Sequence, residues 1–220
     1  MPADKGTSRQ PDEGSSLAQE RDLVELATSG DQRAIGALYD IYVVPLYRFC
    51  LSKLSNETDA EDLTEEIFLK AITSIDKFTW RDTKRKRDDE SVEFNPFRAW
   101  LFRIARNQII STYRKRETRS RVDVHYEDEP VWVADQAPGP EELAERKFLL
   151  EQAAAAIDQL PESQRDVIQL RFMGDMNVNE VAALLGKEPG NVRVLQHKAL
   201  KNLRTILAGE FDLQGVESQR

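Results

Sequence analysis

The sequence predicts an all-α protein of two small helical domains joined by an acidic flexible linker, with a helix-turn-helix in the C-terminal domain. Apolar residues recur at helical spacing along most of the 220 residues, and no stretch alternates as a strand would. Residues 122–142 interrupt this pattern with three prolines and a glycine, and have no helical period. A hydrophobic content of 40% is sufficient for packed cores.

The first domain is expected to span residues 21–117. It follows a polar tail, residues 1–20, whose Ser, Gly, Pro and acidic residues predict disorder. Its first helical stretch begins at Arg21. A second stretch carries its apolar residues up to Tyr42, and Pro45 is expected to kink or end that helix.

Three further segments complete this domain. Residues 58–78 are predicted to be helical, with Thr58 or Asp59 as the N-cap. Residues 79–96 break the periodicity with a basic cluster, an acidic cluster and a proline, which indicates an exposed loop. Residues 97–119 regain the helical period and predict a long helix.

The linker is assigned to residues 118–142, the second domain to residues 143–208, and a tail to residues 209–220. Pro161 is expected to end the first helix of the second domain. Seven acidic residues and no Lys or Arg lie in residues 122–142, so this segment carries nearly all of the net charge of −8. A basic surface can therefore exist elsewhere on this acidic chain.

Residues 177–207 have the spacing of a helix-turn-helix. A small residue lets two helices cross, a glycine four positions later can end the first helix, and an apolar residue can fill the gap between them. These residues are Ala182, Gly186 and Val192.

Start signals mark both helices of this motif. Asn177 and Glu180 have the spacing of a capping box, and Pro189 suits the first turn of the second helix. The second helix then displays polar and basic side chains: Asn191, Arg193, Gln196, His197, Lys198, Lys201 and Arg204. This pattern favours readout of a DNA major groove. The alternative is an ordinary helical hairpin with a solvated basic face.

The helix at residues 97–119 is a second candidate nucleic-acid surface. Between Arg98 and Arg121 lie eight cations and one acid, Glu117. Phosphates bind such a surface through counterion release, without sequence readout. Nearby aromatic side chains can stack on unpaired bases, although core packing is the favoured role of Phe97 and Trp100. The other aromatic candidates are Phe78, Trp80, Phe94 and Tyr113.

Residues 57–66 are strongly acidic, in contrast to the basic helix. Such a face is unsuited to DNA and suits a basic protein partner. The alternative is a solvated helix N-terminus that the helix dipole favours. Composition alone leaves both interpretations open.

The composition also argues against several classes of protein. No nucleophile–base pair, metal-ligand cluster or phosphate-binding glycine loop is evident, so neither catalytic activity nor a cofactor or metal is expected. No apolar run approaches the length needed to span a bilayer, and residues 1–20 lack the features of a signal peptide. Cys50, the single cysteine, is expected to fill the core. These features fit a cytoplasmic protein.

Three segments, in order, resemble the extracytoplasmic-function sigma factors of bacterial RNA polymerase. Residues 59–71 (DAEDLTEEIFLKA) resemble the segment by which sigma factors hold the polymerase. Residues 97–107 (FRAWLFRIARN) resemble the helix that melts the promoter and reads its minus-ten element. Residues 160–172 (LPESQRDVIQLRF), with the helix-turn-helix, resemble the domain that reads the minus-35 element. Together the resemblance covers roughly residues 21–207.

The resemblance implies a role for particular residues at each surface. A coiled coil on the largest polymerase subunit would meet Asp59, Glu61, Asp62, Leu63, Glu66 and Phe68. Minus-ten DNA would lie on or near Arg103, Arg106, Asn107 and Arg114, and Trp80 and Asn95 are the candidates to hold a flipped-out base. The minus-35 groove would face Asn191, Arg193, Val194, His197, Lys198 and Lys201.

The implied function is that of a sigma factor, which is not itself an enzyme, directing core polymerase to promoters and helping to open the DNA. An anti-sigma factor is a further expected partner. The 25 residues of the linker could extend to roughly 80 Å, and promoter elements about 20 base pairs apart are separated by roughly 70 Å. Two alternatives are a helix-turn-helix regulator that acts without core polymerase and a helical protein–protein adaptor.

Overall fold

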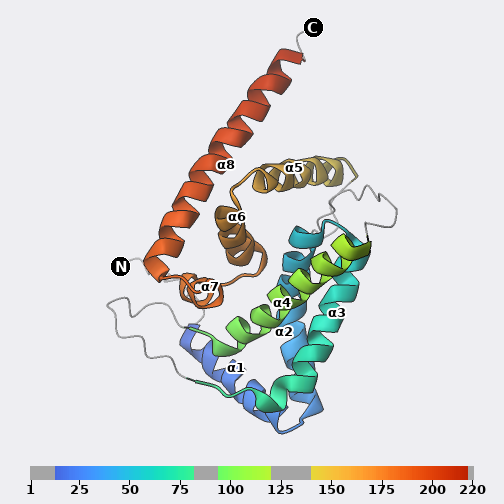
Figure 1. Ribbon diagram of the computed structural model, residues 1–220, viewed down its shortest axis with the longest axis vertical. Helices are drawn as coiled ribbons and strands as arrows, with labels where there is room; N and C mark the ends of the chain where they lie inside the picture. The colour runs from blue at the N-terminus through green and yellow to red at the C-terminus, as the bar shows by residue number, and fades with distance from the viewer. Residues whose placement is uncertain (1–12, 82–93, 120–139, 218–220) are drawn as a thin grey trace, which may run out of the picture.

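The computed structural model describes residues 13–81, 94–119 and 140–217, and the all-α prediction is confirmed for these residues (Figure 1). The N-terminal bundle contains α1 (Glu13–Thr28), α2 (Gln32–Leu54), α3 (Glu57–Ser74), a 3-10 turn η1 (Ile75–Lys77) and α4 (Pro96–Arg119). The C-terminal unit contains α5 (Pro140–Asp158), α6 (Glu162–Ile168), a π-helix η2 (Gln169–Met173), α7 (Val178–Leu185) and α8 (Pro189–Glu217).

Helix α2 is the central element of the N-terminal bundle, in contact with α1, α3 and α4. Its inward side chains include Tyr42, Leu46 and Phe49, all essentially inaccessible to solvent. The Phe49 ring packs against Phe102 of α4, with centroids 5.5 Å apart. Cys50 is fully buried, so its expected role as a core residue is confirmed.

By length and composition, α2 could also cross a membrane, which differs from the expectation that no apolar segment reaches this length. Eight of its side chains are buried within the protein. These residues form the side of α2 that packs in the bundle, whereas Tyr39, Ile41 and Val44 of the same helix are exposed.

Several helix boundaries in the N-terminal bundle differ from the sequence prediction. Helix α1 begins at Glu13, inside the segment expected to be disordered, and it packs on α2 with Val24 and Ala27 buried. Pro45 lies inside α2 and does not end it. Asn56, rather than Thr58 or Asp59, caps α3, and its side chain accepts a hydrogen bond of 2.8 Å from the Asp59 amide.

The C-terminal unit also extends beyond its predicted limits. Helix α5 begins at Pro140, within the segment assigned to the linker, and α8 continues to Glu217, through most of the predicted tail. Residues 120–139, which include most of the predicted linker, and residues 82–93, which include the basic and acidic clusters of the predicted loop, lie outside the described residues.

The two units are packed against each other rather than held apart. Helix α7 contacts α4, and the π-helix η2 contacts α2. One continuous hydrophobic core therefore joins Phe102 of the bundle with Leu170, Met176 and Val181 of the C-terminal unit. A smaller second cluster lies within the C-terminal unit.

Candidate nucleic-acid interface

The helix-turn-helix is formed by α7 and the start of α8. Asn177 caps α7 by accepting bonds from the amides of Asn179 and Glu180, and Glu180 accepts a bond of 2.8 Å from the Asn177 amide. Both halves of the predicted capping box are thus confirmed. Gly186 ends α7 with a φ of +64°, as the turn requires.

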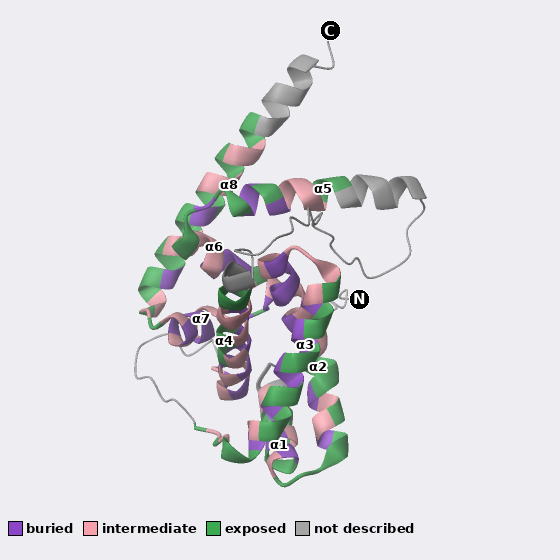
Figure 2. Cartoon of the chain, turned by 45° about the vertical axis from the view of Figure 1, so that its right-hand side comes forward, coloured by how far each residue is buried: buried purple, intermediate pink, exposed green. Residues whose placement is uncertain are grey.

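The second helix of the motif is oriented by its buried residues. Ala182 of α7 and Val192 of α8 are both fully buried, as expected for residues that let the two helices cross and fill the space between them. Ala199, seven residues after Val192, is buried in the second cluster. Because Val192 and Ala199 share one side of α8, the opposite side of the helix faces solvent (Figure 2).

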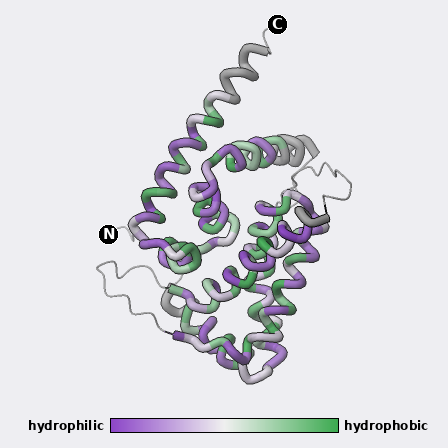
Figure 3. The backbone as a smooth tube through the Cα atoms, viewed as in Figure 1, coloured by the Kyte–Doolittle hydropathy of each residue, from purple (hydrophilic) through white to green (hydrophobic). Residues whose placement is uncertain are grey.

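All six residues predicted to face the minus-35 groove are exposed on α8: Asn191, Arg193, Val194, His197, Lys198 and Lys201. Their spacing places them on one broad face of the helix. Figure 3 shows this part of α8 as mainly hydrophilic, with interspersed apolar residues. Val194 is 53% exposed, which suits an apolar contact with a thymine methyl group.

Helix α4 presents the second basic surface. Leu101, Phe102 and Ala105 are fully buried and fix the inner side of the helix. The predicted minus-ten residues on this helix, Arg103, Arg106, Asn107 and Arg114, are all exposed. Exposure of three guanidinium groups on one helix suits binding to a phosphate backbone.

The aromatic residues beside α4 form a packed cluster. The Phe78 ring lies 5.5 Å from Phe97 and 5.2 Å from Trp100 between centroids, and it meets Trp80 edge to face at 6.4 Å. Phe97 is buried and Trp100 half-buried, consistent with the favoured core role of these two residues. Trp80 is half-buried at the edge of the cluster, next to the segment that is not described. Tyr113, near the other end of α4, donates a hydrogen bond to the Lys53 carbonyl.

Asn95 is not placed to hold a flipped-out base, which corrects one prediction. Its side chain is buried and donates hydrogen bonds to the Glu20 carboxylate (2.6 Å) and to the Tyr42 hydroxyl (3.1 Å). Its oxygen accepts a bond of 2.9 Å from the Arg98 amide, so it also caps α4. The nitrogen and the oxygen of the Asn95 side-chain amide are therefore both hydrogen-bonded within the protein.

A buried polar cluster surrounds Asn95. Burial raises the pKa of Tyr42 well above its ordinary value, and the neighbouring Glu20 raises it further. Burial likewise raises the pKa of Glu180, although the Arg98 guanidinium opposes this shift. Burial lowers the pKa of Arg98, but Tyr42, Glu180 and Glu20 together raise it overall. The cluster thus joins α1, α2, α4 and α7.

The acidic surface predicted to bind the polymerase lies on α3. Glu61, Asp62 and Glu66 are exposed and Asp59 is half-buried. Leu63 and Phe68 are instead buried, because they share the inner side of α3 with Ile67 and pack into the bundle. Leu63 lies four residues before Ile67 and Phe68 follows it directly. The helical periodicity of the sequence therefore already indicated that both lie on the buried side of this helix.

Two exposed apolar residues on α3 were not among the predicted site residues. Leu69 is 64% exposed and Ile72 is 37% exposed. Ile72 also borders a shallow apolar hollow lined by Tyr39 of α2 and Phe68 of α3. Leu69 lies outside the apolar stripe of its helix, which is the signal that distinguishes it in the sequence.

A helical bundle with an exposed basic helix, followed by a helix-turn-helix with a solvent-facing basic helix, defines a DNA-binding protein. Residues 38–119 match the family model described as Sigma-70 region 2, and residues 156–205 match Sigma-70, region 4. The chain belongs to the extracytoplasmic-function sigma factors, which direct RNA polymerase to promoters.

Relatives over most of the chain support this assignment. The chain is 31% identical over 199 residues to the ECF RNA polymerase sigma factor BldN of Streptomyces coelicolor, covering 90% of this chain and 70% of BldN. It is 32% identical over 168 residues to SigX of Bacillus subtilis, covering 76% of this chain and 80% of SigX.

Solved structures show the same fold. The structure of CnrH in complex with the cytosolic domain of CnrY aligns with a TM-score of 0.59 and 27% identity, over 86% of this chain and 97% of CnrH. A second match is the sigma factor RpoE in complex with the anti-sigma factor NepR from Bartonella quintana, with a TM-score of 0.57 and 22% identity, over 79% of this chain and 96% of that chain.

Proposed function

We propose that this sigma factor uses three separate surfaces: the acidic side of α3 for core polymerase, the basic side of α4 for melted minus-ten DNA, and the exposed face of α8 for the minus-35 groove. In this scheme it acts in the cytoplasm and catalyses no reaction itself. The main support is that all six candidate minus-35 residues lie exposed on one face of α8.

Charge supports the assignment of the surfaces. The exposed acids Glu61, Asp62 and Glu66 repel phosphates and attract a basic protein surface. The guanidinium groups of Arg103 and Arg106 attract phosphates and repel such a partner. Polymerase and DNA are thus directed to different helices of one bundle.

Two DNA contacts that each bind weakly give a high affinity for the promoter when one protein makes both. Core polymerase would hold the bundle and the C-terminal unit at the spacing of the two promoter elements, so the second contact forms at high effective concentration. The free protein is therefore expected to bind promoter DNA weakly.

An anti-sigma factor is the expected inhibitory partner. The solved relatives named above include CnrH bound to the cytosolic domain of CnrY and RpoE bound to the anti-sigma factor NepR. The exposed apolar side chains of Leu69 and Ile72 on α3 would suit either such a partner or the polymerase.

Transcription in vitro tests the proposal. Purified protein is added to core polymerase with a library of genomic fragments, and we expect new start sites that depend on both components. Initiation that is unchanged by the protein would contradict the proposal. A band shift of promoter DNA by the protein alone, with no requirement for core, would support the regulator alternative. Partner binding that does not weaken as salt rises would support the adaptor alternative.

A further inference from the structure

We propose that Arg171 of the π-helix η2 and Gln196 of α8 are positioning residues for minus-35 recognition. Their contact fixes how far α8 is rotated about its own axis, and therefore where its exposed side chains meet the bases. Neither residue is among those proposed to contact DNA. This role rests on the proposed function of α8.

Gln196 does not share the exposed face of α8. It lies four residues after Val192 and three before Ala199, the two residues whose burial turns this side of the helix inward. Its side chain is half-buried, and its oxygen accepts a hydrogen bond of 3.2 Å from Nε of Arg171. The sequence places Gln196 among the polar side chains that this helix displays, but the side chain is turned toward the protein.

Arg171 also holds the turn before α7. Its guanidinium donates a second hydrogen bond to the carbonyl of Met176, and the Met176 amide donates a bond of 3.1 Å to the Leu170 carbonyl. Met176 is fully buried, and the next residue, Asn177, caps α7. The Arg171 side chain therefore joins the beginning of α7 to α8, the two helices of the helix-turn-helix. A planar guanidinium can hold two acceptors in fixed directions, whereas a lysine ammonium is a single point of charge.

A second polar contact lies on the other side of the buried stripe of α8. The Asn202 side chain donates a hydrogen bond of 2.9 Å to the side-chain oxygen of Gln164 in α6. At about 100° per residue, Gln196 and Asn202 lie roughly 120° apart around the helix, with Val192 and Ala199 between them. Rotation of α8 in either direction therefore disturbs at least one of the two contacts.

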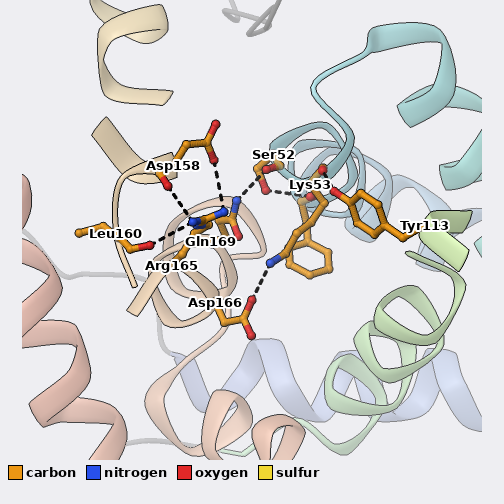
Figure 4. A network of polar contacts seen from close by, with 9 residues as sticks. Ser52, Lys53, Tyr113, Asp158, Leu160, Arg165, Asp166 and Gln169 are labelled. Carbon is orange, nitrogen blue, oxygen red and sulfur yellow. Dashed lines mark hydrogen bonds and ion pairs between the residues drawn. The ribbon is translucent and has the colours of Figure 1, made fainter. Parts of the chain in front are cut away.

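Helix α6 and the π-helix, which make these contacts with α8, are themselves held in place (Figure 4). Arg165 of α6 donates hydrogen bonds to the carbonyls of Asp158 (2.7 Å) and Leu160 (3.1 Å), at the end of α5 and in the turn after it. Gln169, the first residue of the π-helix, is buried and donates a bond of 2.6 Å to the Ser52 carbonyl of α2. Contacts with α6 and the π-helix can therefore set the orientation of α8.

A small rotation of α8 is sufficient to change base recognition. The outer atoms of a helix lie about 6 Å from its axis, so a rotation of roughly 10° moves them by about 1 Å. Hydrogen bonds between nitrogen and oxygen span only about 2.7–3.2 Å, so this shift breaks a bidentate contact with a base. Contacts with phosphates depend mainly on charge and tolerate the shift better. Loss of the Arg171–Gln196 contact should therefore lower discrimination between sequences more than affinity for DNA in general.

The experiment measures how the protein, bound to core polymerase, discriminates between promoter duplexes with a native and an altered minus-35 element, by fluorescence anisotropy. Arg171→Lys keeps the charge but cannot hold both acceptors in the same way. Gln196→Ala removes the acceptor, whereas Gln196→Glu keeps an oxygen that can accept the bond. Asp31→Ala is the control for a loss of stability alone, because it removes the N-cap of α2 in the N-terminal bundle.

We expect Arg171→Lys and Gln196→Ala to reduce the ratio of the two affinities by about three- to tenfold, part of the effect of one base contact. Gln196→Glu and Asp31→Ala should keep the ratio of the wild type. The double variant should lose no more than either single variant, because both remove the same contact. Unchanged ratios in Arg171→Lys and Gln196→Ala would overturn the positioning role. Additive losses, or a loss in Gln196→Glu, would also overturn it, since Gln196 would then contact DNA directly.

A measurement on the free protein separates this role from the proposed function. Amide chemical shifts of residues 193–201 depend on the orientation of α8 and need neither DNA nor polymerase. We expect them to change in Arg171→Lys, a residue distant in sequence, and to keep their wild-type values in Asp31→Ala. If they change as expected but the wild type with polymerase does not distinguish the two minus-35 elements, the proposed function of α8 fails and the orienting contact stands. If they do not change, Arg171 does not orient α8.

Discussion

The two DNA-facing helices differ in how much of their predicted contact surface is open. On α8 every candidate residue is exposed, because Val192 and Ala199 turn the other side of the helix inward. On α4 the candidates Arg103, Arg106, Asn107 and Arg114 are exposed, but Asn95 before the helix and Arg98 in its first turn bond to Glu180 of α7 and to Asp175 in the turn before it. A helix-turn-helix is defined by local signals, whereas the availability of α4 depends on where a distant part of the chain lies.

The largest expected effect is on binding to core polymerase, because the promoter contacts of both α4 and α8 depend on it. Asp62→Lys with Glu66→Lys reverses two charges on the exposed side of α3, and we expect binding to core polymerase to be lost in a pull-down. Both promoter contacts should then fail equally. Asp22→Lys with Asp40→Lys reverses two other exposed acids and should bind as the wild type. Retained wild-type binding by the α3 variant would contradict the docking surface.

The next largest effect is expected on DNA binding by α4, with no effect on DNA binding by α8. Arg103→Ala with Arg106→Ala removes two exposed cations, so the logarithmic salt dependence of binding to unpaired minus-ten strand should become shallower by about 0.7 per cation. Binding of isolated minus-35 duplex should not change. An unaltered salt slope, measured by fluorescence anisotropy with the polymerase complex, would remove α4 from the DNA interface.

A smaller effect is expected on sequence recognition by α8. Arg193→Ala should lose about 1–3 kcal/mol of discrimination between native and altered minus-35 sequences, the range for one bidentate base contact. Arg33→Ala, an exposed arginine on α2, serves as the control for loss of a charge. If Arg193→Ala still distinguishes the two promoters as the wild type does, this arginine reads no base.

The smallest effect concerns the turn that orients α8. Gly186→Ala puts a side chain at a φ of +64°, which should lower the free energy of unfolding by about 1–2 kcal/mol in urea titrations followed by circular dichroism. Gly36→Ala, in a helix and in open space, should instead raise it by about 0.5–1 kcal/mol. Equal stability of both variants would show that the turn tolerates a side chain.

The sequence by itself determined the elements whose signals are local. The capping box at Asn177 and Glu180, the turn at Gly186, the basic face of α8 and the long basic helix α4 all follow from neighbouring residues. Each depends on backbone capping or on helical periodicity, which act over a few residues.

Only the tertiary structure decided which residues of these elements are exposed for binding. Asn95 was a candidate base-binding residue until Glu180, 85 residues away, and Glu20 were found to hold it inside the protein. The packing of the two units against each other has the same origin. Contacts between distant segments depend on shape and burial over the whole chain, and short-range sequence patterns carry no information about them.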